Sequence, residues 1–179
     1  AMIRFDLGFA INWDAATACS FKRINDSTFT GYRFSNGWAK DQRVYFAVRL
    51  SRPVQSVAFF EGKNRVARDE VSNKNLVACL LFDTKPGEPV EMKVALSFAS
   101  VGGAMAALEQ SVNTTFDAAR KNAEASWEKE LGKIKVQSKD KSLLETFYTA
   151  LYHTCLAPVT FTDIKGNYKA VNGAEKKSA

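Results

Sequence analysis

The chain has 179 residues, with 25 Lys or Arg, 19 Asp or Glu and a single His. Hydrophobic residues make up 46% of it and charged residues 25%, a composition that excludes collagen-like, low-complexity and mostly disordered proteins. It contains no run of the ~18 apolar residues that a membrane helix needs, and no export-signal pattern. We expect the natural start to lie upstream of Ala1.

The net charge of +6 raises the question of a nucleic-acid partner. Much of the basic excess lies between Arg120 and Lys141, where Glu124, Glu128 and Glu130 are interleaved with it. That mixture is typical of a solvated helix face. The sequence has no arginine-rich arm and no aromatic RNA-binding motif, so we predict no nucleic-acid partner.

The first hundred residues have the pattern of short strands. Side chains alternate between apolar and less apolar along 44–50 and 90–98, the period of a half-buried strand. In the run 76–82 the even-numbered and the odd-numbered positions are all apolar, which favours a strand covered on both faces. The remaining expected strands are 2–7, 17–24, 28–34 and 54–61. With turn residues between them and no intervening helices, these strands predict an antiparallel β-sandwich.

The pattern becomes helical after Gly102-Gly103, which we interpret as a hinge. Apolar residues spaced by three and four predict a helix over 115–134. A second helix is expected over 142–157, where Ser142-Leu143-Leu144-Glu145 matches a capping box. Its apolar face covers more than half its circumference, and the residues after it supply no partner layer. We therefore expect a truncated protein, able to self-associate through this face.

Few residues suggest chemistry by themselves. His153 lies among aromatic residues on the second helix, where a packed core histidine is more common than a catalyst. Cys19, Cys79 and Cys155 are far apart and have apolar neighbours, which indicates that all three are small buried residues. A single disulfide between two of them is the alternative. No pair of carboxylates is placed in a cleft by its spacing, so we predict no catalytic residue and no metal ligand in this chain.

Two loops are weak candidates for ligand binding. Trp38 follows Asn36-Gly37, where a tryptophan either stacks on a sugar ring or, more commonly, anchors its hairpin. The segment from Asp163 to Asn167 has oxygen-bearing side chains in a turn but lacks the other ligands of a calcium loop. A plain turn is the better interpretation of that segment.

Two longer stretches are more specific. The run from Gly31 to Gln42, GYRFSNGWAKDQ, followed by Val44-Tyr45-Phe46, resembles a segment of the bacterial α-mannosidases of glycoside hydrolase family 92. The run Phe147-Tyr148-Thr149-Ala150-Leu151-Tyr152-His153, continuing through Pro158, Phe161, Asp163, Gly166 and Tyr168, is similar to that family's entry into its catalytic domain. The likeness departs at Asn172, where we expect an acidic residue.

The resemblance implies a fold and an activity. Members of that family have an N-terminal β-sandwich, a helical linker and an (α/α)6 barrel, and they are secreted or periplasmic exo-acting, calcium-dependent α-mannosidases that invert the anomeric carbon. Many cut α-1,2-linked mannose. Their acid, base and calcium ligands come from the barrel, so the resemblance implies a fragment that is inactive by itself. Asp163 and Tyr168 are then candidates for contact with substrate.

The sequence thus predicts a mainly β protein with C-terminal helices. We expect the later part of the sandwich in 1–103, a helical linker in 104–139 and the start of a barrel in 140–179. If the chain is such a fragment, the resemblance implies that the full-length enzyme binds mannose-containing glycans and uses calcium as its cofactor. It implies no calcium bound by this chain. The alternative is a stand-alone carbohydrate-binding or protein-interaction module.

Overall fold

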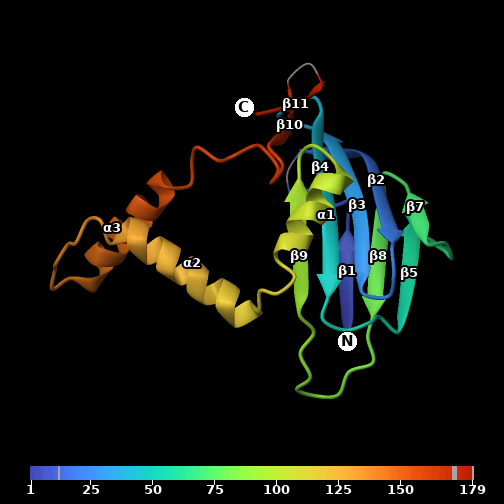
Figure 1. The fold of residues 1–179 in the computed structure, drawn as a ribbon, viewed down its shortest axis with the longest axis horizontal. Helices are drawn as coiled ribbons and strands as arrows, with labels where there is room; N and C mark the ends of the chain where they lie inside the picture. Colours follow the sequence, from blue (N-terminus) through green and yellow to red (C-terminus); the bar gives the residue numbers. More distant parts are fainter. Residues whose placement is uncertain (12, 171–172, 179) are drawn as a thin grey trace. The chain divides into compact units, whose positions relative to one another are not determined.

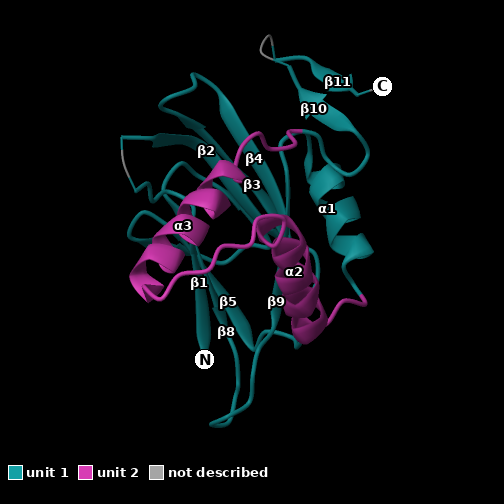
Figure 2. Cartoon of the chain, turned by 90° about the vertical axis from the view of Figure 1, so that its left-hand side faces the viewer, with its two compact units in different colours: residues 1–112, 162–179 teal, residues 113–161 magenta. Residues whose placement is uncertain are grey.

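The computed structural model of the chain describes residues 1–11, 13–170 and 173–178, so Asn172 lies outside the described residues. The chain divides into two compact units (Figure 2). Unit 1 consists of Ala1–Val112 together with Thr162–Ala179, and unit 2 consists of Asn113–Phe161. Unit 1 is therefore discontinuous in sequence, with unit 2 inserted into it.

Unit 1 is built on two antiparallel sheets (Figure 1). The first sheet has the strand order β1-β8-β5-β6 and the second has the order β7-β2-β3-β4-β9. In chain order the strands are β1 (Met2–Asp6), β2 (Ala15–Arg23), β3 (Thr28–Asn36), β4 (Gln42–Leu50), β5 (Ser56–Glu61), β6 (Asn64–Val66), β7 (Glu70–Ser72), β8 (Leu76–Leu81) and β9 (Met92–Ser97).

Side chains from both sheets form one hydrophobic core. The Phe21 ring of β2 lies 5.6 Å from that of Phe46 in β4 and 5.8 Å from that of Phe59 in β5. Leu76 and Leu80 of β8 are fully buried in the same cluster. This shared core confirms the predicted sandwich, because alternating strands bury one face of each sheet against the other.

Within the two sandwich sheets, the strands that the sequence did not predict are β6 and β7. Each has three residues, and polar side chains occupy most of their positions. The prediction that 76–82 is covered on both faces is wrong for its odd-numbered positions. Val77 and Cys79 are only half-buried, because sheet β1-β8-β5-β6 has the second sheet on one side only.

Helix α1 (Val101–Gln110) packs on the second sheet. Its buried Ala104 and Leu108 contact Ala47 of β4 and Ala95 of β9. The helix begins at Val101, with the Ser100 hydroxyl accepting from the Gly103 backbone N–H at 3.0 Å. The prediction of a hinge at Gly102-Gly103 is therefore wrong, since both glycines lie in the first helical turn.

Unit 2 contains helix α2 (Phe116–Leu131) and helix α3 (Lys141–Thr154), so both predicted helices are confirmed. The predicted capping box at Ser142 is wrong. The Asp140 carboxylate caps α3 instead, accepting from the backbone N–H groups of Ser142 and Leu143 at 2.9 and 3.2 Å. Asp140 takes this role because its carboxylate stands one residue before the first helical position.

Neither helix of unit 2 has a buried residue. His153 and Cys155 are exposed, so the predictions of a packed core histidine and a buried Cys155 are wrong. The physical reason is that two helices alone cannot enclose a side chain from all sides. Cys19 is buried as predicted, Cys79 is half-buried, and all three thiols are free.

The chain returns to unit 1 through the turn at 163–166 and a short hairpin of β10 (Asn167–Lys169) and β11 (Glu175–Lys177). Gly166 has φ +79° there, and its N–H donates to the Asp163 carbonyl at 2.9 Å, which confirms a turn. Among the described residues no helix is long and apolar enough to cross a bilayer.

Candidate functional site

Loops at one end of the sandwich bring exposed aromatic residues together. They are the segments 7–11 and 13–14 before β2 and the β3–β4 turn at 37–41. Trp38 in the turn is 90% exposed, and Trp13 before β2 is 65% exposed. Their ring centroids lie 6.4 Å apart with the planes tilted by 43°. Two exposed indoles side by side offer an apolar surface of the kind that ligand sites use.

Three contacts hold the two loops in place. A side chain on Gly37 would lie 3.1 Å from the Asp14 Cα, so the absence of one lets the turn approach the other loop. Arg33 Nη1 donates to the Asp14 carboxylate at 3.0 Å. The same guanidinium donates through Nε to the Leu7 carbonyl at 3.0 Å. Arg33 therefore ties Leu7 and Asp14 to β3.

A further ion pair connects the β3–β4 turn to the β10–β11 hairpin. Lys169 Nζ donates to Asp41 Oδ2 at 2.9 Å, and Arg43 Nε donates to Asp41 Oδ1 at 3.0 Å. The hydrogen bonds from Lys169 and then Arg43 lower the pKa of Asp41 below its ordinary value. Arg43 also stacks over the Phe34 ring at 4.9 Å. The carboxylate thus carries a permanent negative charge between two cations at neutral pH.

Two of the three predicted site residues lie on these connected segments. Trp38 precedes Asp41 in the turn, and Tyr168 precedes Lys169 in β10, where it pairs with Lys176 and is half-buried. Figure 1 shows β10 and β11 beside the end of β4 that carries this turn. The contact of Trp38 and Tyr168 with substrate stays a prediction.

Asp163 has different surroundings. Its carboxylate is buried, and Oδ1 accepts from the backbone N–H groups of Lys165 and Asn167 at 2.9 and 2.8 Å. Oδ2 lies against Gly103 in the first turn of α1. Asp163 is thus one of the residues through which the returning segment packs on the rest of unit 1, and its contact with substrate likewise stays a prediction.

Sequence reasoning missed Trp13. It lies 25 positions before Trp38, and no periodic pattern connects the two loops. The only available signal was Gly37, since a glycine in a turn beside an aromatic residue permits close approach of another segment.

The carboxyl groups with shifted pKa values do not resemble a general acid. Lys133 lowers the pKa of Glu130 and Arg52 lowers that of Glu88, as the two cations do for Asp41. A glycosidase acid needs the opposite, a raised pKa. Within 1–11, 13–170 and 173–178, moreover, no group of three or more His, Cys, Asp or Glu side chains is placed to hold a metal ion. These residues do not fit a calcium site.

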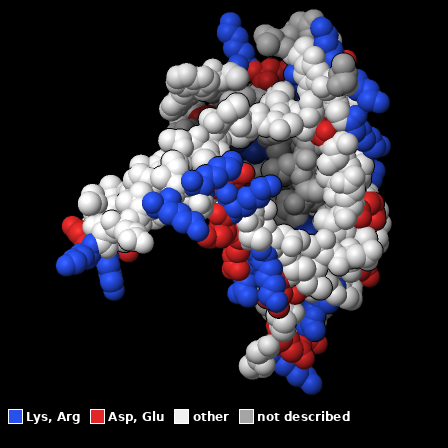
Figure 3. Space-filling view, turned by 60° about the vertical axis from the view of Figure 1, so that its left-hand side comes forward, with Lys and Arg blue, Asp and Glu red and all other residues white. Residues whose placement is uncertain are grey.

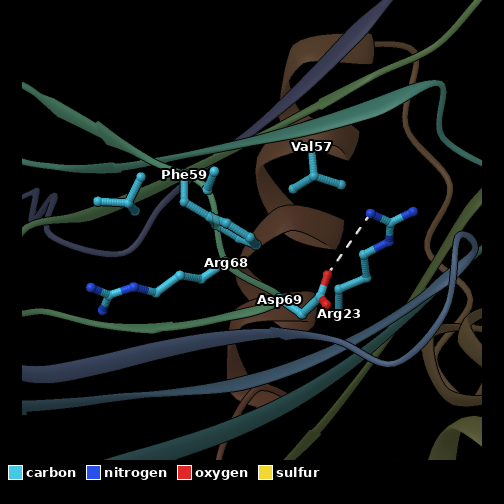
Figure 4. A pocket seen from close by; sticks show the side chains of 7 residues that line it. Arg23, Val57, Phe59, Arg68 and Asp69 are labelled. Carbon is cyan, nitrogen blue, oxygen red and sulfur yellow. Dashed lines mark ion pairs between the residues drawn. The ribbon is translucent and has the colours of Figure 1, made fainter.

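A small pocket of about 270 Å³ lies elsewhere on unit 1, lined by residues of β2, β5, β6 and the segment before β7 (Figure 4). Val57 and Phe59 provide apolar walls. Arg23 pairs with Asp69 at 4.0 Å, and the side chain of Arg68 points away from Arg23. The pocket contains none of the predicted site residues.

Charged side chains of both signs are interspersed on the face shown in Figure 3. On α2, Arg120 forms ion pairs with Asp117 at 3.6 Å and with Glu124 at 3.7 Å. The absence of nucleic-acid binding stays a prediction.

Two family models match the chain in sequence order. The model of the glycosyl hydrolase family 92 N-terminal domain matches residues 1–97, and that of the family 92 catalytic domain matches residues 103–179. The chain belongs to glycoside hydrolase family 92. The family 92 resemblance predicted from residues 31–46 and 147–168 is therefore confirmed. The chain matches no curated protein sequence.

Solved family 92 enzymes have the same fold. The α-mannosidase BT3965 from Bacteroides thetaiotaomicron is 35% identical with a TM-score of 0.93, and the match covers 99% of this chain and 25% of that one. The same enzyme has been solved in complex with mannoimidazole. The inverting mannosidase BT2199 from the same species, 22% identical, has a TM-score of 0.84 over 98% of this chain and 24% of its own. This family 92 chain thus spans about a quarter of the length of these solved relatives.

Proposed function

We propose that this chain is part of an exo-acting α-mannosidase that removes terminal α-1,2-linked mannose from glycans with inversion. The observation that carries the proposal is the ordered match of 1–97 to the N-terminal domain and of 103–179 to the catalytic domain of one glycosidase family. The likeness to BT3965, an α-mannosidase at 35% identity, supports mannose as the sugar.

We further propose that the 179-residue chain is inactive by itself. Inversion requires an acid carboxyl and a base carboxylate roughly 6.5–9.5 Å apart, with space for the attacking water between them. The shifted carboxyl groups described above all have lowered pKa values, which is unsuited to the acid role. We assign the acid, the base and the calcium ion to parts of the enzyme outside residues 1–179. Calcium would supply a hard cation for oxygen ligands there.

The proposed role of the sandwich is to present aromatic surface to the glycan. The Trp13–Trp38 pair is exposed, and its loops are fixed by Arg33 and Gly37. Contacts that hold Leu7, Asp14 and Gly37 before binding reduce the entropy lost on binding, which favours this surface. Tyr168 is the second proposed contact, and Asp163 positions the segment that carries Tyr168.

Helix α3 is proposed as the first helix of the (α/α)6 barrel. Leu143 in its first turn and Leu156, two residues after its last, are exposed, and none of the residues of the helix is buried. The remaining barrel helices would cover this apolar face. In their absence, the chain is expected to self-associate through it. Because a mannosidase of this type acts on glycans outside the cytoplasm, we propose a periplasmic or extracellular location.

The test uses the protein isolated from its source cells with an antibody against this chain. We expect a species several times heavier than 19.8 kDa that hydrolyses an aryl α-mannoside and loses activity with a calcium chelator. Among mannobioses, the α-1,2-linked one should be cleaved fastest, with β-mannose as the first product by NMR. The isolated 179-residue chain, assayed in parallel with calcium, should show no turnover.

A native species of 19.8 kDa would contradict the proposal and revive the stand-alone binding module. That alternative is not favoured, because residues 103–179 match a catalytic domain and not a binding module.

A further inference from the structure

The pocket shown in Figure 4 lies where the chain crosses from the first sheet to the second. The crossover 67–69 connects the edge strands β6 and β7, and each of them covers only part of its longer neighbour. β6 pairs with β5 only from Phe59 to Glu61, and β7 pairs with β2 only from Ser20 to Lys22. Val57 and Arg23 lie beyond these two ladders, so the edge of the sandwich is open between them.

The inner walls of the pocket are apolar. Val57 and Phe59 pair with two fully buried residues of β8, so both side chains point between the sheets. Val66 of β6 pairs with Phe59 and has the same orientation. Phe59 is buried beneath, whereas Val57 and Val66 are half-buried and form the accessible walls. The cavity of about 270 Å³ is just below the size of drug-sized ligand sites, about 300–1,000 Å³, so it suits a single ring.

The mouth of the pocket has hydrogen-bonding groups of both kinds. The Arg23 guanidinium donates through Nη2 to Asp26 Oδ1 at 2.5 Å, and its Nη1 lies 4.0 Å from Asp69 Oδ1. A separation of 4.0 Å is too long for a hydrogen bond. It accommodates one hydroxyl group, which donates to the carboxylate and accepts from the guanidinium. The Asp69 side chain is 83% exposed, so this position is open to a ligand.

The charges at the mouth favour a neutral ligand. Asp26 and Asp69 together balance the formal charges of Arg23 and Arg68. Arg23 already shares its guanidinium between two carboxylates, which disfavours a further anion there. The side chain of Arg68 points away from Arg23, so the two cations do not form a common anion site (Figure 4). A cationic ligand would in turn be repelled by Arg23. Hydroxyl groups, which both donate and accept, fit this arrangement.

We propose that this pocket binds one neutral pyranose ring, a terminal mannose of the glycan. A pyranose combines an apolar face of C–H groups with hydroxyl groups around its edge. The C–H face lies on Val57 and Val66, while one hydroxyl bridges Arg23 and Asp69. A purely apolar molecule leaves that bridge unmade. The choice of mannose rests on the proposed function, whereas the choice of a neutral pyranose rests on the pocket itself.

The pocket is remote from the Trp13–Trp38 pair. Trp13 lies two residues before the start of β2, and Arg23 is the last residue of that strand. At about 3.4 Å per residue, the nine residues of β2 separate its two ends by about 27 Å. One sugar ring cannot reach both places, so the pocket is a second site and not a part of the first. A branched glycan that occupies both sites is held more tightly than by either one.

The pocket is tested by titrating methyl α-mannoside into the ¹⁵N-labelled 179-residue chain. We expect saturable NMR shifts of the Val57, Val66 and Asp69 amides, with a Kd in the millimolar range. Asp69→Ala should raise this Kd about tenfold, because the bridging hydroxyl loses its charged acceptor. Asp117→Ala is the matched control, since that carboxylate is 76% exposed and also pairs with an arginine, and it should leave the Kd unchanged. Tetrahydropyran, a ring of the same size without hydroxyl groups, should give no saturable shifts.

The outcomes separate the pocket from the proposed function. The absence of saturable shifts at Val57 and Val66 would overturn the pocket, whatever the activity of the native protein. Equal binding of tetrahydropyran, or an unchanged Kd in Asp69→Ala, would also overturn it, since neither result requires the hydroxyl bridge. A native mass of 19.8 kDa would instead refute the proposed function, with the mannoside titration still deciding whether the pocket accepts a sugar.

Discussion

The carboxylate of Asp163 occupies the space that a side chain on Gly103 would need. A Cβ built on Gly103 would overlap Asp163 Oδ2 and lie 2.7 Å from the hydroxyl of buried Ser97. Gly103 is a good choice at this point of α1 because it permits the contact, although glycine is a weak helix former. The contact joins two segments that unit 2 separates in sequence.

Gly103→Ala is therefore expected to destabilise unit 1 by about 1–3 kcal/mol through overpacking. Gly102→Ala is the matched control, because a Cβ there meets only the Ser100 hydroxyl at 3.7 Å. That variant should be neutral or stabilising by up to about 1 kcal/mol. Denaturant unfolding of both variants measures the difference. Equal stabilities of the two variants would show that the segment of Asp163 moves aside at no cost in free energy of unfolding. The double variant Gly103→Ala, Asp163→Ala should lose less free energy of unfolding than the two single variants together.

The Asp41–Lys169 ion pair predicts a pH dependence for the β10–β11 hairpin. The pKa of Asp41 is lowered from 3.8 in the folded chain, so the unfolded state binds the proton first as pH falls. The contribution of the pair is complete above 3.8 and is lost as pH falls through the lower folded value. The protection of the Asn167–Lys169 amides, measured relative to their intrinsic exchange rate at each pH, should fall over that interval. In Asp41→Asn this protection should already be lower at neutral pH and should not fall further below pH 3.8. The same acid response in this variant would contradict the assignment.

The Trp13–Trp38 contact predicts an optical signature. Two indoles at 6.4 Å with a 43° tilt should couple and give an exciton couplet in circular dichroism. Trp13→Ala and Trp38→Ala should each remove the same couplet, while Trp127→Phe should leave it unchanged. Because Trp38 is exposed, Trp38→Ala should change stability by less than about 0.5 kcal/mol. A couplet that survives either single variant would refute the pair.

The structure and the sequence pattern assign the cap of α3 to different residues, Asp140 and Ser142, and mutation can distinguish the two. Asp140→Ala should destabilise α3 by about 1 kcal/mol, because the N–H groups of Ser142 and Leu143 lose their acceptor. Ser142→Ala removes the residue that the capping-box pattern selects and should change helix stability by less than about 0.5 kcal/mol. Amide exchange of Ser142 and Leu143 reports the effect directly. A larger effect of Ser142→Ala than of Asp140→Ala would support Ser142 as the cap, as the capping-box pattern predicts.

The sandwich was predictable because its determinants are local. Alternation along 44–50 and 90–98 identifies β4 and β9 without knowledge of their partners. By contrast, β6 and β7 have three residues each, too few to show a period. The register that leaves Val94 exposed depends on which strand faces it, which no local pattern records.

The candidate site was less predictable than the fold. Trp38 was identified from its turn, but its partner Trp13 was not, because the contact joins two loops distant in sequence. Gly102-Gly103 suggested flexibility, whereas the close approach of Asp163 explains the second glycine. His153 and Cys155 belong to an apolar pattern but are exposed, since the two helices of unit 2 bury none of their residues.

The return of Thr162–Ala179 to unit 1 has a consequence for cleavage. Both strands that flank the insertion, β9 before it and β10 after it, are held by contacts within unit 1, so neither depends on an unbroken link through Asn113–Phe161. A protease that cuts within that link should leave two fragments that stay together on a native gel and separate only in denaturant. The covalent chain would be broken while the folded particle survived.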